Sequence, residues 1–350
     1  MTKKTIRIII AAVLAVLLVV VLRLSLKPPV EEQGGPRIVM GTFARVIAVA
    51  ADSKTAENCI KAAFEQLATV ENLMSAYKED SELTRINNQA HLAPVKVSAP
   101  TFEVLQRSVE FSRLTDGAFD VTIGPLVDLW RAAHEANSPP NDWQLRQARD
   151  KVGYDKLILD ADNLSVKFTV EGMRLDLGGI AKGWAIDRAI KTMQEKGARG
   201  GMVDVGGDIR CFGLPPKGKK HWLIGLQDPH EAKDALTVGK PLLVLKLSDA
   251  AVATSGGYRR FALIEGKKYS HIIDRKTGTA ADSLSSASII TDSATKADAL
   301  ATAVTVLGPQ KGLQLIEKIP KTEAILISPP PKYKLTNTTG ANTYITQTHR

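Results

Sequence analysis

Apolar side chains are most concentrated near the amino end of the chain, where Ile8 to Leu22 contains no polar residue. Lys3, Lys4 and Arg7 precede this run, and Arg23 follows it. A basic segment followed by an apolar one is typical of a membrane-targeting signal. Its fifteen residues would form a helix about 22 Å long, which is short for a hydrocarbon core of about 30 Å.

Two interpretations fit this segment: a cleaved signal peptide and an uncleaved anchor. Counting from Ile6 to Leu26, with the arginine side chains reaching back to the interface, brings the segment near the length of a span. Leu22 to Leu26 is a poor small-x-small cleavage site. We therefore expect an uncleaved anchor over residues 1–26, with its basic end in the cytoplasm and the rest of the chain exported.

The Pro- and Gly-rich residues 27–36 are interpreted as a linker, and residues 37–350 as the folded part. In the folded part, apolar residues recur with helical spacing over 55–74, 100–114, 142–152, 180–196, 293–308 and 312–318. Strand-like runs cover 38–51, 157–159, 165–170, 173–176, 201–205, 222–227, 242–247, 251–254, 260–265, 269–274 and 286–290. Because the strands come in meanders rather than in strict alternation with helices, we predict an α+β fold of mixed sheets with flanking helices.

The amino-acid composition limits the classes of function that this chain can have. The 350 residues are 44% hydrophobic and only 5% aromatic, which predicts a large, mostly aliphatic core. The net charge of +9 includes an amino-terminal region, residues 1–30, that has several basic residues and no acids. The remaining mild excess suits an anionic substrate. No basic run interleaved with aromatics is present, so we expect no nucleic-acid partner.

The two cysteines, Cys59 and Cys211, do not have the spacing of a metal site. An exported chain can form a disulfide, and the sequence leaves that question open. Cys59 lies on the apolar face of the helix expected over 55–74, which favours a buried free thiol.

Three Gly-Gly turns lie beside charged residues: Asp176 to Gly183, Val205 to Asp208, and Thr254 to Arg259. Glycine lets the backbone approach a phosphate closely, and a helix that begins there offers free N–H groups. Lys182 and Arg259 would add positive charges that suit a pyrophosphate. The glycine spacing matches neither a Walker loop nor a dinucleotide fingerprint, and each turn taken alone is equally an ordinary connection.

Asp298 and Thr302 are four residues apart on an expected helix, so their side chains lie on one face. Such a pair can hold a hard cation through oxygen alone, and Mg²⁺ prefers sparse oxygen sites completed by water and phosphate. His271, on the strand expected over 269–274, is either a general base or a hydrogen-bonded structural histidine. Tyr77 and Phe119 lie in polar loops, where each either stacks on a planar ring or packs on the protein.

Taken in order, these segments resemble the ApbE family of flavin transferases. The stretches that carry the resemblance run from Met40 to Gly308 and follow the family's order: Met40–Thr42, Ser75–Leu83, Asp116–Leu126, Asp176–Gly183, Val205–Asp208, Ser255–Arg259, His271–Gly278 and Asp298–Thr302. The resemblance implies an ApbE-like fold and an Mg²⁺-dependent transfer of FMN from FAD to a threonine hydroxyl of a target protein, with release of AMP. This reaction is post-translational flavinylation.

The resemblance also implies roles for individual residues. His271 matches the proposed base, and we expect Asp298 to be essential for catalysis. Asp298 and Thr302 match side-chain metal ligands, and Gly179 matches a backbone ligand. The positions that match or suit FAD contacts are Met40, Tyr77, Ala118, Phe119, Asp120, Asp176, Lys182, Arg259 and Ile273.

Two alternatives remain beside this reading: an Mg²⁺-dependent FAD pyrophosphatase that gives free FMN and AMP, and an exported FAD-binding protein without turnover. The resemblance implies acceptors that are flavoprotein subunits of membrane redox complexes. It also implies a location at the inner membrane of a bacterium, with the catalytic part on the periplasmic side. Family members are commonly lipoproteins, whereas this chain has no Cys near its apolar segment to receive a lipid.

Overall fold

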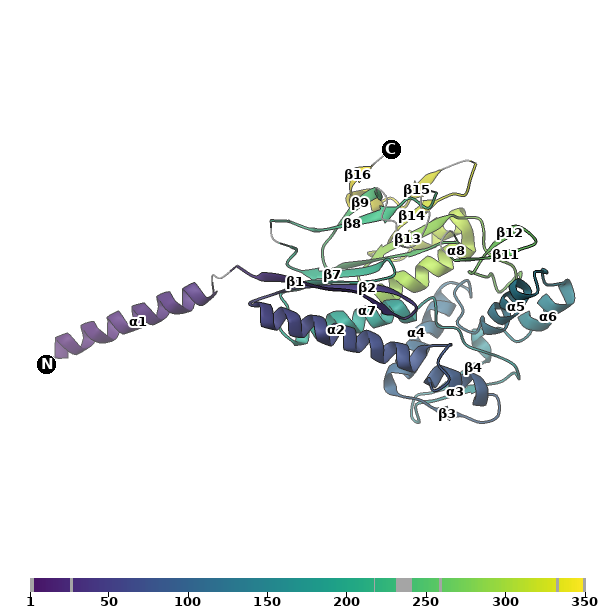
Figure 1. Ribbon diagram of the computed structural model, residues 1–350, viewed down its shortest axis with the longest axis horizontal. Coiled ribbons are helices and arrows are strands. Elements are labelled where there is room, and N and C mark those ends of the chain that lie inside the picture. The colour runs from purple at the N-terminus through teal and green to yellow at the C-terminus, as the bar shows by residue number, and fades with distance from the viewer. Residues whose placement is uncertain are drawn as a thin grey trace.

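The computed structural model describes residues 3–25, 28–216, 218–230, 241–257, 260–331 and 334–348 (Figure 1). Helices cover α1 Lys3–Ser25, α2 Ser53–Met74, α3 Glu82–Gln89, α4 Ala99–Leu114, α5 Gly124–Glu135, α6 Asp142–Arg149, α7 Ala181–Glu195 and α8 Ala294–Ile316. Strands cover β1 Val30–Val39, β2 Thr42–Ala50, β3 Val95–Lys96, β4 Leu157–Asp160, β5 Ser165–Phe168, β6 Gly200–Val205, β7 Asp208–Gly213 and β8 Trp222–Gln227. The later strands are β9 Pro241–Leu247, β10 Ala250–Ser255, β11 Phe261–Ile264, β12 Lys267–Ser270, β13 Ser286–Thr291, β14 Glu323–Ile327, β15 Leu335–Asn337 and β16 Ile345–Thr348.

An eight-stranded sheet organises the fold, in the order β1-β2-β6-β7-β10-β13-β14-β15. Every neighbouring pair in it is antiparallel. Smaller sheets are formed by β11-β12, by β16-β9-β8 and by β3-β5-β4. This arrangement confirms the prediction of an α+β fold of sheets with flanking helices, but the paired strands of these sheets are antiparallel rather than mixed.

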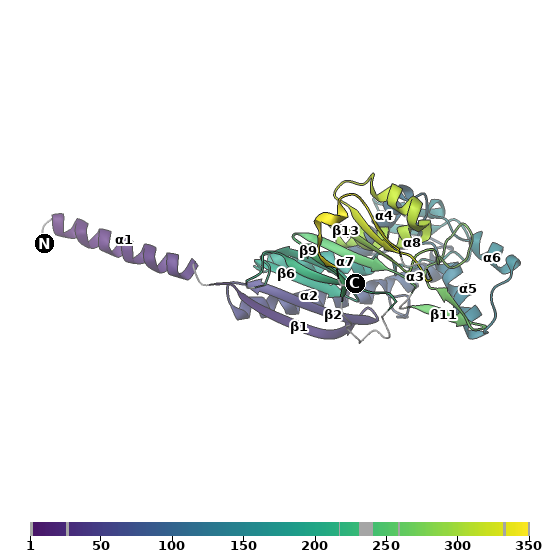
Figure 2. The same cartoon turned by 90° about the horizontal axis from the view of Figure 1, so that it is seen from above.

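The middle strands of the large sheet are buried on both faces. On β2, Ala44, Val46 and Ala48 belong to the core shared with α2 and α7, while Ile47 and Val49 belong to a second core shared with β8 and β9. Figure 1 shows these layers on opposite sides of the sheet, and in both Figures 1 and 2 α1 extends away from the folded part. Because successive strand residues point to opposite faces, a sheet covered on both sides requires nearly continuous apolar strands.

The predicted linker is wrong over residues 30–36, which form the first part of β1 and pair with β2. The register shifts between Gly34 and Arg37, so the Gly-Gly-Pro segment lies in a bulge. A proline is tolerated there because β1 is an edge strand, where one N–H of each pair faces away from the sheet. The run expected over 38–51 is likewise two strands that turn at Met40 and Gly41.

Further elements differ from expectation, whereas the break at Gly308 agrees with it. The run 173–176 makes only an isolated bridge between Ile123 and Arg174. A helix that was not predicted, α5, begins at Gly124, and Pro125 near its start has the fixed φ that a first helical turn requires. The backbone of α8 is non-helical at Gly308, where the first of two helices was expected to end, and the helical segment that follows to Ile316 agrees with the helix expected over 312–318.

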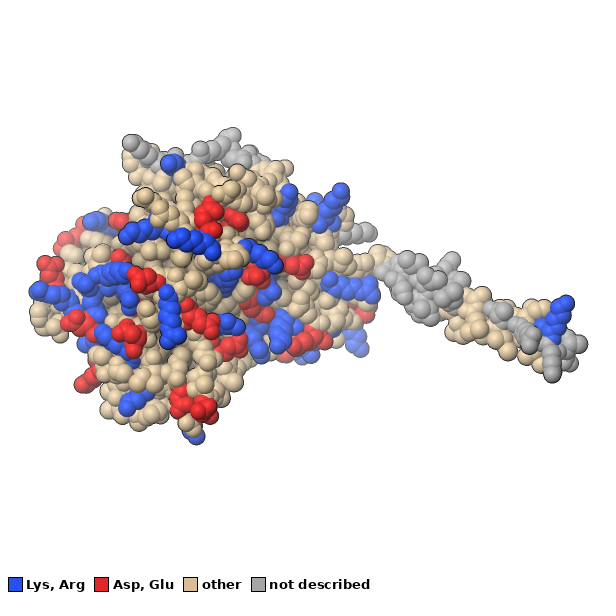
Figure 3. Space-filling model, turned by 180° about the vertical axis from the view of Figure 1, so that it is seen from behind, with Lys and Arg blue, Asp and Glu red and all other residues tan. Residues whose placement is uncertain are grey.

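The amino-terminal segment forms α1, yet among the described residues no helix combines the length and apolar character needed to cross a membrane. Cys59 and Cys211 are both buried and free, in the cores on opposite faces of the large sheet. Burial raises the pKa of both thiols. On the face shown in Figure 3, Lys and Arg side chains are interspersed with Asp and Glu.

Candidate active site

Several turns meet at one end of the large sheet. The β1–β2 turn at Met40 and Gly41 lies beside the β6–β7 turn, where the N–H of Gly206 donates to the carbonyl of Phe43 at 2.9 Å. Arg260, which precedes β11, reaches the carbonyl of Gly41 at 3.4 Å. The β1–β2 turn, the β6–β7 turn and the segment before β11 are therefore neighbours in the fold.

Helices α7 and α8 meet closely beside these turns. A Cβ at Gly183 would lie 2.3 Å from the carbonyl oxygen of Ala294, so only glycine fits this contact without movement of the backbone. The N–H of Gly183 donates to Oδ2 of Asp298 at 3.0 Å. The glycine after Lys182 thus lets the start of α7 touch the first turns of α8.

A buried charge cluster lies at this contact. The ammonium group of Lys182 is 2.8 Å from Oδ2 of Asp208 and 3.3 Å from each carboxylate oxygen of Asp298. The main-chain N–H of Thr254 fixes the other oxygen of Asp208 at 3.1 Å. The cluster joins α7, α8, β7 and β10.

The electrostatics of this cluster follow from its burial. Burial raises the pKa of Asp298, the positive charge of Lys182 lowers it, and the negative charge of Asp208 raises it; together with the hydrogen bond from Gly183 these effects bring the pKa to about 6. Desolvation lowers the pKa of Lys182, but the two carboxylates outweigh it and raise that pKa. Burial therefore disfavours the charged form of Asp298, and the ammonium group of Lys182 comes no closer to it than 3.3 Å. A divalent cation bound directly to the carboxylate would stabilise that charge more strongly.

The donors around Asp298 fit a hard cation. Thr302 lies one helical turn further along α8, and its Oγ1 is 3.4 Å from Oγ of Ser255. A Cβ at Gly179 would come within 2.9 Å of that Oγ1, so the glycine backbone lies directly beside the pair. No group of three or more His, Cys, Asp or Glu able to hold a metal occurs in the described part of the chain. A metal here would therefore rely on Asp298, the Thr302 hydroxyl, main-chain oxygen, and oxygens from substrate or water, a set that suits Mg²⁺.

His271 lies directly after β12 rather than within a strand, because β12 ends at Ser270. Its Nδ1 is 3.0 Å from the carbonyl oxygen of Arg260, and the side chain keeps solvent exposure. Partial desolvation lowers the pKa of His271, and the positive charges of Arg260 and Lys182 lower it too, whereas the hydrogen bond and Asp176 act the other way. The imidazole is therefore neutral at pH 7 and can accept a proton.

The positions expected to contact FAD have different surroundings. Tyr77 is 85% exposed, with the guanidinium of Arg131 5.7 Å from its ring. Met40 is partly buried at positive φ in the β1–β2 turn. Asp176 accepts from the N–H of Gly178 at 2.7 Å and so shapes the glycine turn.

Other expected contacts are largely internal. Phe119 is buried and packs edge-on against Phe111, with the neighbouring Ala118 partly buried. Asp120 is buried and accepts four hydrogen bonds, from the N–H and hydroxyl of Thr122, the N–H of Tyr154 and the guanidinium of Arg275. Ile273 is buried. Arg259 lies outside the described residues.

A model of the ApbE family matches residues 40–326. The chain belongs to the ApbE family. Over 317 residues it is 34% identical to an FAD:protein FMN transferase from Treponema pallidum, covering 86% of this chain and 85% of that protein. It is 36% identical over 270 residues to an FAD:protein FMN transferase from Vibrio cholerae, covering 76% and 78%. The crystal structure of the ApbE protein from Thermotoga maritima superposes with a TM-score of 0.78 at 28% identity, covering 91% of this chain and all of that one.

Two residues of this ApbE-family protein, Asp208 and Asp187, were not predicted from the sequence to belong to the site. Asp208 was noted only as the end of a glycine turn, yet it makes the shortest contact with Lys182. Asp187 was not predicted, although its carboxylate accepts hydrogen bonds from the first two N–H groups of α8. A carboxylate directly after Gly206-Gly207 is a usable signal for the first, whereas only the tertiary fold reveals the second.

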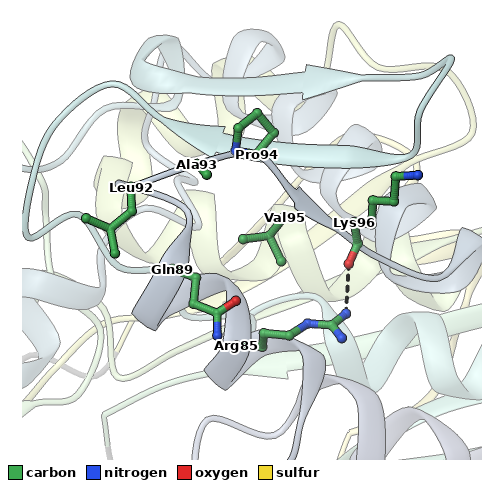
Figure 4. A pocket seen from close by; sticks show the side chains of 7 residues that line it. All are labelled: Arg85, Gln89, Leu92, Ala93, Pro94, Val95 and Lys96. Atoms are coloured by element: carbon green, nitrogen blue, oxygen red, sulfur yellow. Dashed lines mark hydrogen bonds between the residues drawn. The ribbon is translucent and has the colours of Figure 1, made fainter.

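A surface pocket of this ApbE-family protein lies elsewhere, between α3 and β3, where Arg85 donates to the carbonyl of Lys96 at 2.8 Å (Figure 4). The residues that line it are Arg85, Gln89, Leu92, Ala93, Pro94, Val95 and Lys96. None of them belongs to the charge cluster.

Proposed function

We propose that this protein transfers FMN from FAD to a threonine hydroxyl of an acceptor protein, with Mg²⁺ and with release of AMP. The family and its FAD:protein FMN transferase relatives support flavin transfer. The observation that carries the proposal is the meeting of Lys182, Asp298 and Thr302 beside the Gly178–Gly179 turn. Such a cluster provides charge neutralisation and close backbone approach, which are what transfer of a phosphorus-linked group chiefly requires.

The step forms one bond and breaks one. The acceptor hydroxyl oxygen bonds to the phosphorus of the FMN half of FAD, the diphosphate P–O bond breaks, and its electron pair leaves with AMP. His271 takes the hydroxyl proton, since its lowered pKa leaves the ring neutral. Lys182 and the N–H groups of the glycine turn bind phosphate oxygens.

Asp298, Thr302 and Gly179 would hold the metal. When bound, Mg²⁺ would supply Lewis-acid stabilisation of charge on the diphosphate. Asp298 is suited to this because it is buried and fixed by Gly183, and because its negative charge balances the cation. We propose that Tyr77 contacts a planar ring of FAD; the exposure of most of its surface supports this role.

Location and partners are part of the proposal. We propose that residues 1–26 hold the protein at the inner membrane, with residues from Val30 onward on the periplasmic side. We further propose that the acceptors are flavoprotein subunits of membrane redox complexes. The basic and apolar pattern of residues 3–22 supports the first idea. Membrane fractionation, with protease protection of the folded part, tests it.

Product analysis tests the reaction itself. The full chain is mixed with FAD, Mg²⁺ and a candidate acceptor, and the acceptor's mass and free AMP are measured. We expect FMN covalently attached to a threonine, with one AMP per FMN attached, and no product with Asp298→Ala. Free FMN together with AMP would show a pyrophosphatase instead, and bound FAD without turnover would show a binding protein. A fully active Asp298→Ala variant would refute the metal assignment.

A further inference from the structure

Asp187 lies on α7, one helical turn after Gly183, and faces the start of α8. Its carboxylate accepts five hydrogen bonds, more than any other acid named here. Oδ1 accepts from the N–H of Ala294 at 2.9 Å and from the guanidinium of Arg210 at 2.6 Å. Oδ2 accepts from the N–H and hydroxyl of Thr295, at 2.9 and 2.6 Å, and from the hydroxyl of Ser293 at 2.7 Å.

These bonds complete the amino-terminal cap of α8. The first four N–H groups of a helix have no partner inside it. Here Asp187 satisfies Ala294 and Thr295, and the Ser293 side chain satisfies Lys296, while Ala297 makes the first ordinary helical bond, to the Ser293 carbonyl. The negative charge also lies at the positive end of the helix dipole. The first turn of α8 is therefore fixed by a side chain from another helix.

The same carboxylate also ties β7 to the two helices, through Arg210. Asp208 precedes Arg210 by two residues on β7, so the two side chains share one side of the strand. Lys182 precedes Asp187 on α7, and Asp298 follows the capped turn on α8. One group thus connects all three elements that supply the charge cluster.

We propose that Asp187 is the positioning residue of the active site: it sets α8 and β7 relative to α7 so that Asp298, Asp208 and Lys182 meet. This inference rests on the proposed function, because it predicts a role in metal binding. It assigns Asp187 no contact with substrate. It follows that a loss of Asp187 weakens cation binding at Asp298 even though every proposed ligand remains.

The test compares Asp187→Asn with Asp52→Asn in the full chain. Asp52 is a matched control, because it caps α2 through the N–H and hydroxyl of Thr55, both at 2.9 Å, and α2 supplies no residue to the charge cluster. Thermal unfolding midpoints are measured over a range of Mg²⁺ concentrations with FAD present. We expect Asp187→Asn to need about tenfold more Mg²⁺ for the same rise in midpoint, as is typical of second-layer changes. We expect Asp52→Asn to lose stability while keeping the wild-type Mg²⁺ dependence.

The remaining outcomes are also decisive. An unchanged Mg²⁺ dependence in Asp187→Asn would overturn the inference. If Asp187→Asn does not fold, Thr295→Val removes one of the five hydrogen bonds and should give a smaller increase in the Mg²⁺ concentration that is needed; no increase would overturn the inference.

If the wild type itself shows no response to Mg²⁺, the proposed metal role fails. Hydrogen exchange at Ala297 and Asp298 then tests Asp187 alone, with faster exchange expected in Asp187→Asn and unchanged exchange contradicting it.

Discussion

The ammonium group of Lys182 lies 2.8 Å from Asp208, which reaches it from a strand that begins 26 residues further along the chain. Asp298 lies 3.3 Å from the same ammonium group. Both carboxylates are almost fully buried, so their charges depend on this one cation or on a substitute for it.

Replacing Lys182 by Met should therefore destabilise the protein by about 3 kcal/mol, because two buried carboxylates lose their partner. Millimolar Mg²⁺ should restore much of the loss by supplying positive charge at Asp298. Lys276→Met is the control, because its pair with Asp116 is on the surface and should contribute little. Chemical denaturation with and without Mg²⁺ measures both effects. If Lys182→Met loses the same stability with and without Mg²⁺, a cation site at Asp298 is contradicted.

Gly183 should not tolerate alanine, since the added Cβ would meet the backbone of Ala294 at 2.3 Å. We expect Gly183→Ala to cost about 1–3 kcal/mol of stability and to lower activity by moving α8. Gly312→Ala, in the second half of α8, is the comparison, because its Cβ would meet mainly the Val304 side chain. Unfolding midpoints and initial rates decide the matter. A wild-type unfolding midpoint together with a wild-type initial rate in Gly183→Ala would contradict the close contact between α7 and α8.

The pH dependence should report His271. Its pKa is lowered from 6.5, so the ring loses its proton at a pH below that value and is a competent base at pH 7. kcat/KM should therefore rise with pH, with a midpoint below 6.5, and then level off. At saturating Mg²⁺, which would compete with protons for Asp298, His271→Gln should abolish this rise. His134→Gln is the control, since His134 makes the same type of contact with a main-chain oxygen, that of Leu263. The same rise in His271→Gln would assign the base elsewhere.

Tyr77→Ala should weaken FAD binding by about tenfold while leaving stability unchanged, because an 85% exposed ring has little core packing to lose and stacking on a base is worth about 1–3 kcal/mol. Trp143→Ala serves as a control, as Trp143 is also an exposed aromatic, on α6. Fluorescence titration with FAD compares the affinities. Unchanged affinity in Tyr77→Ala would exclude a stacking role.

Local patterns account for what the sequence predicted well. Helical spacing placed Asp298 and Thr302 on one face, and α8 has that geometry. Runs of apolar residues bounded by turns located most strands of the large sheet, since burial on both faces requires them. The glycine turns were visible because glycine permits backbone geometries that other residues avoid.

Tertiary relationships account for the rest. Asp187 and the residues that it caps are more than a hundred positions apart, and no local pattern joins them. Residues 30–36 were misread because Gly-Gly-Pro is typical of a linker, whereas an edge strand can hold it in a bulge. Asp120 belongs to a motif whose sequence does not show that Arg275 lies beside it.

A crystal structure with FAD and Mg²⁺ tests the central claim most directly. We predict an ion about 2.1 Å from an Asp298 oxygen and from Oγ1 of Thr302, with the diphosphate of FAD bound to it. An ion or a diphosphate bound away from these two oxygens would contradict the account.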